Sequence, residues 1–397
     1  MRVPEWQGWL VLGGLVVAFA VLTWWLLFSP LRRWVRPVER SPRLRQTIAV
    51  LVFISGVSFT VGAAWDELWH RQFGGFGNDF LWPPHLLMYA SLGMNALFAV
   101  TGLRLALRGQ GGVRERFRAE PLLGLLGLIA AYQMASIPSD LLWHQIIGPD
   151  LTAWSLPHWL LVMTTGATWL VGMAIARSTV SQFSTWRPLS TSPMDLLCLG
   201  FVTLMSLMLL QFGVTEWEWL SGPDAEVVLL NRPAWSYPVV VLLVGIATSY
   251  LALHATRRFG AATLVALVAL AVRWLTVSAE SGLLSSAPVI GSHLLLVPGA
   301  VVLDLWYALR SDRDLLFTRV LGSALYAAAF LVVGLPYAQQ VVAVPGLVEG
   351  AIPASIGIGV LVAVIGGIVF ADLGAWVHPP GRASAIEAGI TPERASA

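Results

Sequence analysis

The sequence carries little charge for its length. Charged residues make up 12% of the 397 positions, and hydrophobic residues make up 57%. Soluble domains have roughly a quarter charged residues, so the composition excludes an ordinary soluble domain and predicts an integral membrane protein. The formal net charge is only +2. We therefore expect the lipid bilayer as a partner and no nucleic acid.

The chain has one cysteine and no lysine. Cys198 is the single cysteine, and all of the positive charge comes from arginine. One cysteine excludes a disulfide framework, a cysteine-based zinc site and an iron–sulfur cluster, so any metal must bind nitrogen and oxygen atoms. The chain has no phosphate-binding loop, no G-x-S-x-G, no H-E-x-x-H and no C-x-x-C-H motif. The chain therefore lacks the common sequence signatures of nucleotide-binding proteins, serine hydrolases, zinc proteases and c-type haem proteins.

Long apolar runs are abundant, and each is long enough to cross a bilayer as a helix of about twenty residues. We predict an all-α, polytopic protein with about eleven spans. A ten-span protein, with one of the weaker late runs merged or lost, is the alternative. The eleven runs are 8–28, 46–66, 84–106, 120–142, 156–177, 194–213, 236–255, 260–279, 292–309, 318–336 and 353–375.

The arginines predict the orientation of these spans, because short loops rich in arginine stay in the cytoplasm. Arginines crowd the segments after the first and third runs and recur in alternate later connections. The opposite loops contain Trp, Pro, Asp and Glu instead. We therefore expect a plasma (inner) membrane protein with its N-terminus outside and a disordered cytoplasmic tail at 377–397.

One motif occurs twice in the loops expected outside. Each copy has an aspartate, a histidine four residues later, a short loop, and a Pro-His dipeptide that opens the next apolar run. The chain has only seven histidines, and four of them belong to this motif. The copies consist of Asp66, His70 and His85, and of Asp140, His144 and His158.

The motif belongs to a wider repeat of helical hairpins. His293 opens a helix as His85 and His158 do, and Trp217 to Asp224 resembles Trp143 to Asp150. We expect one transmembrane domain over 1–376, built from five hairpins. Metal-motif hairpins occupy 46–106 and 120–177, and degenerate hairpins occupy 194–255, 260–309 and 318–375.

The spacing within each copy suits metal binding. Residues at i and i+4 lie on one face of a helix, about 6 Å apart at Cβ. The Pro-His histidine returns on the neighbouring helix, so two imidazoles and one carboxylate face a common point. This ligand set accepts copper, zinc, iron or manganese, and it leaves coordination positions open. The affinity order favours Cu(II) or Zn(II), whereas geometry also allows iron. The alternative is a hydrated Asp–His ion pair at the membrane surface.

Other polar residues are weaker candidates. Asp79 and Asp150 could orient ligating histidines, and Glu218, Glu280 and His293 could form a third site. Arg273 lies within an apolar span, where a charge needs a partner; we expect Glu280 or Glu218 in this role. We expect His254 and Asp304, near cytoplasmic ends, to be solvated.

The segment from Asp140 to His158 resembles the copper-binding segment in the C subunit of particulate methane and ammonia monooxygenases. The shared features are an aspartate, a histidine four residues later with glutamine after it, a downstream aspartate, and a histidine opening the next helix. The resemblance implies copper at Asp140, His144 and His158, with Asp66, His70 and His85 repeating the arrangement. It also implies partner membrane subunits.

These features favour a metalloprotein that oxidises a small or lipophilic substrate with O₂ at copper; the catalytic residues are not assigned. Three alternatives remain open from the sequence. The chain could transport or deliver copper or zinc, it could be a zinc-dependent hydrolase within the membrane, or it could be a structural or lipid-interacting subunit without a metal.

Overall fold

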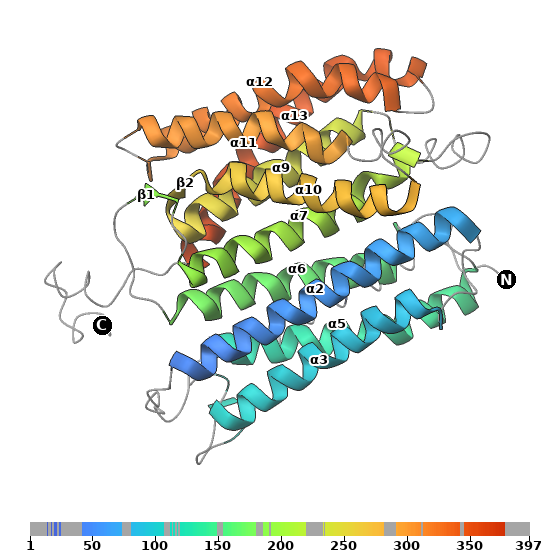
Figure 1. Ribbon diagram of the computed structural model, residues 1–397, viewed down its shortest axis with the longest axis vertical. Coiled ribbons are helices and arrows are strands. Elements are labelled where there is room, and N and C mark those ends of the chain that lie inside the picture. Colours follow the sequence, from blue (N-terminus) through green and yellow to red (C-terminus); the bar gives the residue numbers. More distant parts are fainter. Residues whose placement is uncertain are drawn as a thin grey trace, which may run out of the picture.

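A computed structural model places most of the chain. It describes residues 14, 17, 20, 21, 24, 42–73, 81–106, 112, 114, 115, 117, 120–148, 154–179, 186–189, 192–219, 233, 235–281, 291–310, 313–341 and 345–377. The described part is a stack of helices that run roughly alongside one another (Figure 1). The expected tail, 377–397, lies outside it apart from Val377.

Ten long helices make up the described fold, and they match the last ten of the eleven expected spans. The late runs are all separate helices, and the expected run 8–28 lies largely outside the described residues. The helices are α2 (Pro42–Phe73), α3 (Pro83–Ala106), α5 (Pro121–Ile146), α6 (Leu156–Arg177), α7 (Pro193–Trp219), α9 (Ser236–Thr256), α10 (Ala261–Ser281), α11 (Gly291–Leu309), α12 (Leu316–Val341) and α13 (Pro345–Val377).

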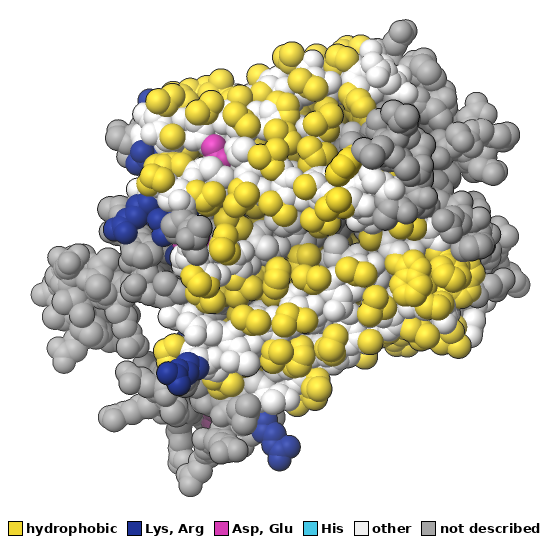
Figure 2. All heavy atoms as spheres, in the orientation of Figure 1, with side chains coloured by type: hydrophobic (Ala, Val, Ile, Leu, Met, Phe, Trp, Pro, Cys, Tyr) yellow, Lys and Arg dark blue, Asp and Glu magenta, His cyan; other side chains and the backbone are white. Residues whose placement is uncertain are grey.

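Each of these helices is long and apolar enough to cross a membrane. The shortest, α11, has 19 residues, which at 1.5 Å per residue extends about 28 Å, close to the thickness of a bilayer core. Large apolar side chains such as Leu97, Val100 and Val332 are 60%, 62% and 78% exposed, and apolar groups cover the flank of the molecule (Figure 2). The protein is an all-α, multi-pass membrane protein.

Consecutive helices pack as hairpins: α2 with α3, α5 with α6, α7 with α9, α10 with α11, and α12 with α13. The first two hairpins form a four-helix bundle, because α3 also packs on α5 and α2 also packs on α6. Helix α7 contacts α2 and α6 on one side and α9 and α10 on the other. It therefore joins the metal-motif bundle to the C-terminal helices.

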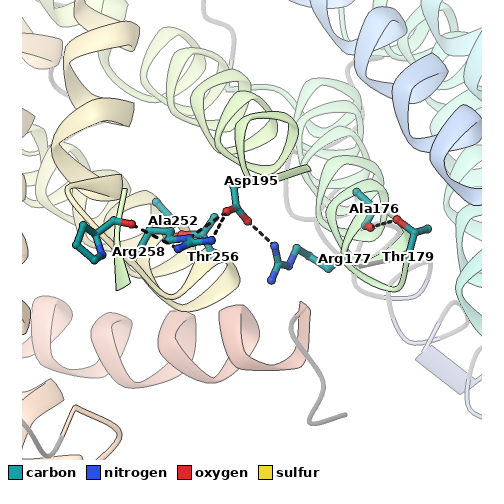
Figure 3. Close-up of polar contacts among 8 residues, drawn as sticks. Ala176, Arg177, Thr179, Asp195, Ala252, Thr256 and Arg258 are labelled. Carbon is teal, nitrogen blue, oxygen red and sulfur yellow. Dashed lines mark hydrogen bonds and ion pairs between the residues drawn. The ribbon is translucent and has the colours of Figure 1, made fainter. Parts of the chain in front are cut away.

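Arginine marks one end of the described helices. Arginine side chains gather at the end where two short strands lie, β1 (Arg187–Pro188) and β2 (Arg258–Phe259) (Figures 1 and 2). The strands pair in parallel. Beside them, Asp195 of α7 lies between two guanidinium groups (Figure 3). Its carboxylate accepts hydrogen bonds from Arg177 Nη1 and, at 3.0 Å, from Arg258 Nε.

His254 and Asp304 are buried, contrary to the expectation that water solvates them. His254 Nε2 lies 3.1 Å from the hydroxyl of Tyr307. Asp304 accepts hydrogen bonds from the backbone N–H groups of Gly260 and Thr263, at 2.9 and 2.7 Å. The first N–H groups of a helix have no partner within the helix, and Asp304 of α11 satisfies them for α10. The sequence does not reveal which helices pack against each other. The expectation that water solvates His254 and Asp304 was wrong for this reason.

Replacing Asp304 with alanine is expected to lower the free energy of unfolding by about 1–3 kcal/mol, because buried N–H groups at the start of α10 lose their acceptor. Thermal unfolding in detergent would measure the change. Asp372 pairs with Arg319 but its side chain is 66% exposed, so Asp372→Ala is a matched control that should cost less than about 1 kcal/mol. Equal losses in the two variants would contradict the role of Asp304.

Candidate metal centre

The first Asp/His motif forms a compact group at the end of α2 and the start of α3. His70 Nε2 lies 3.6 Å and His85 Nε2 lies 2.9 Å from Asp66 Oδ1. One ligand atom from each of the three residues can be chosen so that all lie within 4.8 Å of one another. Among the described residues, no other group of three His, Cys, Asp or Glu side chains meets this condition. The expected convergence of these three residues is confirmed.

The spacing of these atoms fits a bound metal ion. With metal–ligand bonds of about 2.0–2.1 Å, two ligands of a tetrahedral site lie about 3.3 Å apart. The two distances at Asp66 Oδ1 fall on either side of that value. This oxygen is buried and, among the described residues, receives no N–H or O–H in hydrogen-bonding geometry. The two histidine nitrogens lie near this oxygen without hydrogen-bonding geometry, so Asp66 Oδ1 would be free to bind a cation held by the same histidines.

The second motif occupies the matching place at the end of α5 and the start of α6. His144 Nε2 lies 3.5 Å and His158 Nε2 lies 4.0 Å from Asp140 Oδ1. These three residues lie near one another, but they do not meet the spacing condition that the first group meets, so the second group is the looser of the two. His158 is also more open, with 30% of its side chain exposed, whereas His85 has 10% exposed.

Both histidines of the second group are held through Nδ1. His144 Nδ1 lies 3.2 Å from the carbonyl oxygen of Gly148, and His158 Nδ1 lies 2.8 Å from Ser155 Oγ. A carbonyl oxygen only accepts, so the ring of His144 carries its proton on Nδ1. In the neutral ring Nε2 then carries the lone pair, and this nitrogen would bind a metal ion shared with Asp140. Ligating histidines generally have such a contact on the second ring nitrogen.

Aromatic rings lie against the first group and next to the second group in the sequence. The ring of Trp82 lies 5.6 Å from that of His70, and Trp69 packs on Trp82 at 5.7 Å. Trp159, the residue after His158, packs on Phe212 at 4.9 Å, and Trp154 donates its indole N–H to the Phe212 carbonyl oxygen at 3.0 Å. Apolar surroundings limit the access of water to a metal site and so affect its redox potential.

Comparison of the chain with protein-family models, curated proteins and solved structures gives no match. The resemblance to the copper-binding segment of the monooxygenase C subunit stays a prediction from Asp140 to His158. In the structure both histidines of this segment lie near Asp140 Oδ1, at the distances given above.

Of the five weaker candidates for metal binding, His293 alone has a described side chain. Asp79 and Asp150 lie outside the described residues, as do the side chains of Glu218 and Glu280. His293 is described and is 1% exposed, at the start of α11. It lies within electrostatic reach of Arg273, and a guanidinium group disfavours a cation. The part of the chain that the structure describes therefore gives no support to a third metal site there.

Arg273 has a buried partner that the sequence reasoning missed. Its guanidinium group forms a two-pronged ion pair with Glu67 of α2, through Nη1 and Oε2 and through Nη2 and Oε1. The expected partners were Glu280 or Glu218. Glu67 follows Asp66 directly and is a charged residue in the last turns of an apolar helix, which was the only sign in the sequence that it needs a partner.

Proposed function

We propose that the protein is a membrane metalloprotein with two His₂Asp sites on its extracytoplasmic face. The convergence of Asp66, His70 and His85 carries this proposal. The second site, at Asp140, His144 and His158, has the same ligands on the same kinds of helix ends. Helix α2 runs from the arginine-rich end of the molecule to the opposite end, where α3 begins and the first site lies (Figures 1 and 2). This distribution supports a cytoplasmic location for that end and an outer location for the sites in the plasma membrane.

The metal that fits the ligand set best is copper. Two imidazoles and one carboxylate bind Cu(II) more tightly than the other divalent metals of the first transition row, and no sulfur ligand is present to favour another choice. Three protein ligands leave positions for an exogenous ligand, as in catalytic rather than structural metal sites. When bound, copper would supply the redox chemistry that a reaction with O₂ requires.

The proposed activity is oxidation of a small or lipophilic substrate by O₂. Both sites lie where apolar helices end, so a substrate dissolved in the bilayer can approach them along the apolar flanks of α2, α3, α5 and α6. The protein residues would hold the metal, and the aromatic rings of Trp82 and Trp159 would keep the surroundings apolar. Partner membrane subunits, as in the monooxygenases that the second motif resembles, belong to the same proposal.

Metal transport through the bundle has less support. An ion path requires ionisable groups in the membrane interior. Among the described residues of the four-helix bundle, charged side chains and imidazoles lie within two turns of the helix ends. The interior holds neutral groups that satisfy one another: Gln133 Nε2 donates to Thr165 Oγ1 at 2.8 Å, and Thr168 donates to Gln133 Oε1.

Electron paramagnetic resonance of the Cu(II)-loaded protein tests the proposal. The spectrum should contain nitrogen hyperfine coupling from two sites, and His70→Ala and His144→Ala should each remove one component. A spectrum with oxygen ligation only, or one that neither variant changes, would overturn it. Zinc binding without copper binding would redirect the proposal to hydrolysis by metal-activated water.

Ser155→Ala is expected to weaken copper binding at the second site by about tenfold to 100-fold, the usual range for loss of a contact that orients a ligand. The reason is that Ser155 Oγ holds His158 through Nδ1, and its side chain does not cap α6. Titration with Cu(II) in the His70→Ala background isolates this site. Ser139→Ala is the control, since the Ser139 hydroxyl donates a hydrogen bond to the Ala135 carbonyl oxygen, one turn back in its own helix. An unchanged affinity in Ser155→Ala would show that the contact is not needed.

A further inference from the structure

The ion pair between Glu67 and Arg273 lies one residue from a metal ligand. Successive side chains of an α-helix leave the axis about 100° apart. Asp66 thus faces His85 on α3, and Glu67 faces Arg273 on α10. Both charges of the pair are almost fully buried, at 6% and 4% exposure. The outer end of α2 is therefore fixed from two directions, and a rotation that moved Asp66 would also break the ion pair.

The second copy of the motif has no corresponding anchor. Leu141 takes the place of Glu67 after the aspartate, and its side chain is 38% exposed. Pro138, two residues before Asp140, interrupts the hydrogen bonding of α5 because proline has no N–H. In this copy the two histidine nitrogens lie 3.5 and 4.0 Å from the carboxylate oxygen, whereas in the anchored copy they lie 3.6 and 2.9 Å away. The anchored copy is the tighter one.

Arg273 occupies the aspartate position of the fourth hairpin, which α10 and α11 form. It precedes His293 by 20 residues, while Asp66 precedes His85 by 19 and Asp140 precedes His158 by 18. All three histidines are the third residue of their helices. In the α10–α11 hairpin a guanidinium group thus replaces the ligand carboxylate, and its charge is directed at α2. The α10–α11 hairpin thus stabilises the first copy of the motif instead of binding a cation itself.

We propose that Arg273 is a positioning residue for the first metal site. Through Glu67 it holds the last turns of α2 so that Asp66 and His70 meet His85, and this makes the first site the tighter of two unequal sites. The second site, without this anchor and with an exposed His158, is the exchangeable one. This inference rests on the proposed function.

The test uses the full-length protein and Cu(II) as the probe. The His144→Ala background reports the first site and the His70→Ala background reports the second. In each background the ion pair is removed with Glu67→Gln/Arg273→Gln, which leaves no unpaired charge in the interior. We expect the first site to bind Cu(II) at least about tenfold more weakly with altered hyperfine coupling, and the second site to stay within about twofold. The exchanged pair Glu67→Arg/Arg273→Glu should restore most of the affinity.

The outcomes separate the inference from the proposed function. If neither background binds Cu(II) with nitrogen ligands, the proposed function fails and this inference fails with it. If the first site binds Cu(II) but keeps its affinity and spectrum without the ion pair, the inference alone is overturned. Equal weakening of both sites would show a general loss of structure and would also overturn a positioning role. Weakening of the first site alone, with rescue by the exchanged pair, supports it.

Discussion

Replacement of His85 by alanine is expected to weaken Cu(II) binding at the first site by more than about 100-fold, beyond the range found for residues that only orient a ligand. His85 supplies the nitrogen closest to Asp66, at 2.9 Å. Without it, the site keeps one imidazole and one carboxylate from the same helix, four residues apart. The dissociation constant should be measured in the His144→Ala background, so that the second site does not contribute.

His378→Ala is the matched control for this prediction, because His378 is a histidine outside both motifs. It should leave the dissociation constant unchanged. The thermal unfolding of His85→Ala should also be followed without metal. If His85→Ala binds Cu(II) as tightly as the background protein, then Asp66, His70 and His85 form a surface ion-pair cluster and not a metal site.

Replacement of Arg273 by leucine is expected to lower the free energy of unfolding by about 3–5 kcal/mol, the usual cost of breaking a buried ion pair on one side. The reason is that the Glu67 carboxylate would stay buried, at 6% exposure, without its guanidinium partner. The effect should appear in thermal unfolding of the metal-free protein in detergent.

The double variant Glu67→Leu/Arg273→Leu distinguishes a lost ion pair from lost packing. Removing both charges avoids the unpaired carboxylate, so most of the stability should return. A double variant as unstable as Arg273→Leu would mean that the size and shape of the arginine, and not its charge, matter at this position.

The membrane spans could be predicted from the sequence because their signal is local. Runs of about twenty apolar residues suffice to identify a span, and proline at Pro83, Pro121 and Pro193 marks helix starts where its missing N–H is harmless.

The proximity of the residues within each Asp/His group could also be predicted from the sequence. Each aspartate and its first histidine share a helix face, and the second histidine returns on the adjacent helix, so no long-range contact had to be guessed.

The polar contacts between distant hairpins could not be predicted in this way. Glu67 and Arg273 are separated by 206 residues, and Asp304 reaches the start of α10 from another helix. Such contacts depend on which hairpins pack together, and hydrophobic periodicity in membrane helices carries little information about this packing. The unequal spacing of the two Asp/His groups was hidden for the same reason, since it follows from the neighbours of α2 and α5.

The metal content of the purified protein tests the central claim most directly. After loading with Cu(II) and removal of the excess, elemental analysis should find two copper ions per unmodified chain, one in His70→Ala, one in His144→Ala and none in the double variant. Copper, zinc and iron all absent from the unmodified protein after loading, or a copper content that the two substitutions leave unchanged, would contradict the assignment of both sites.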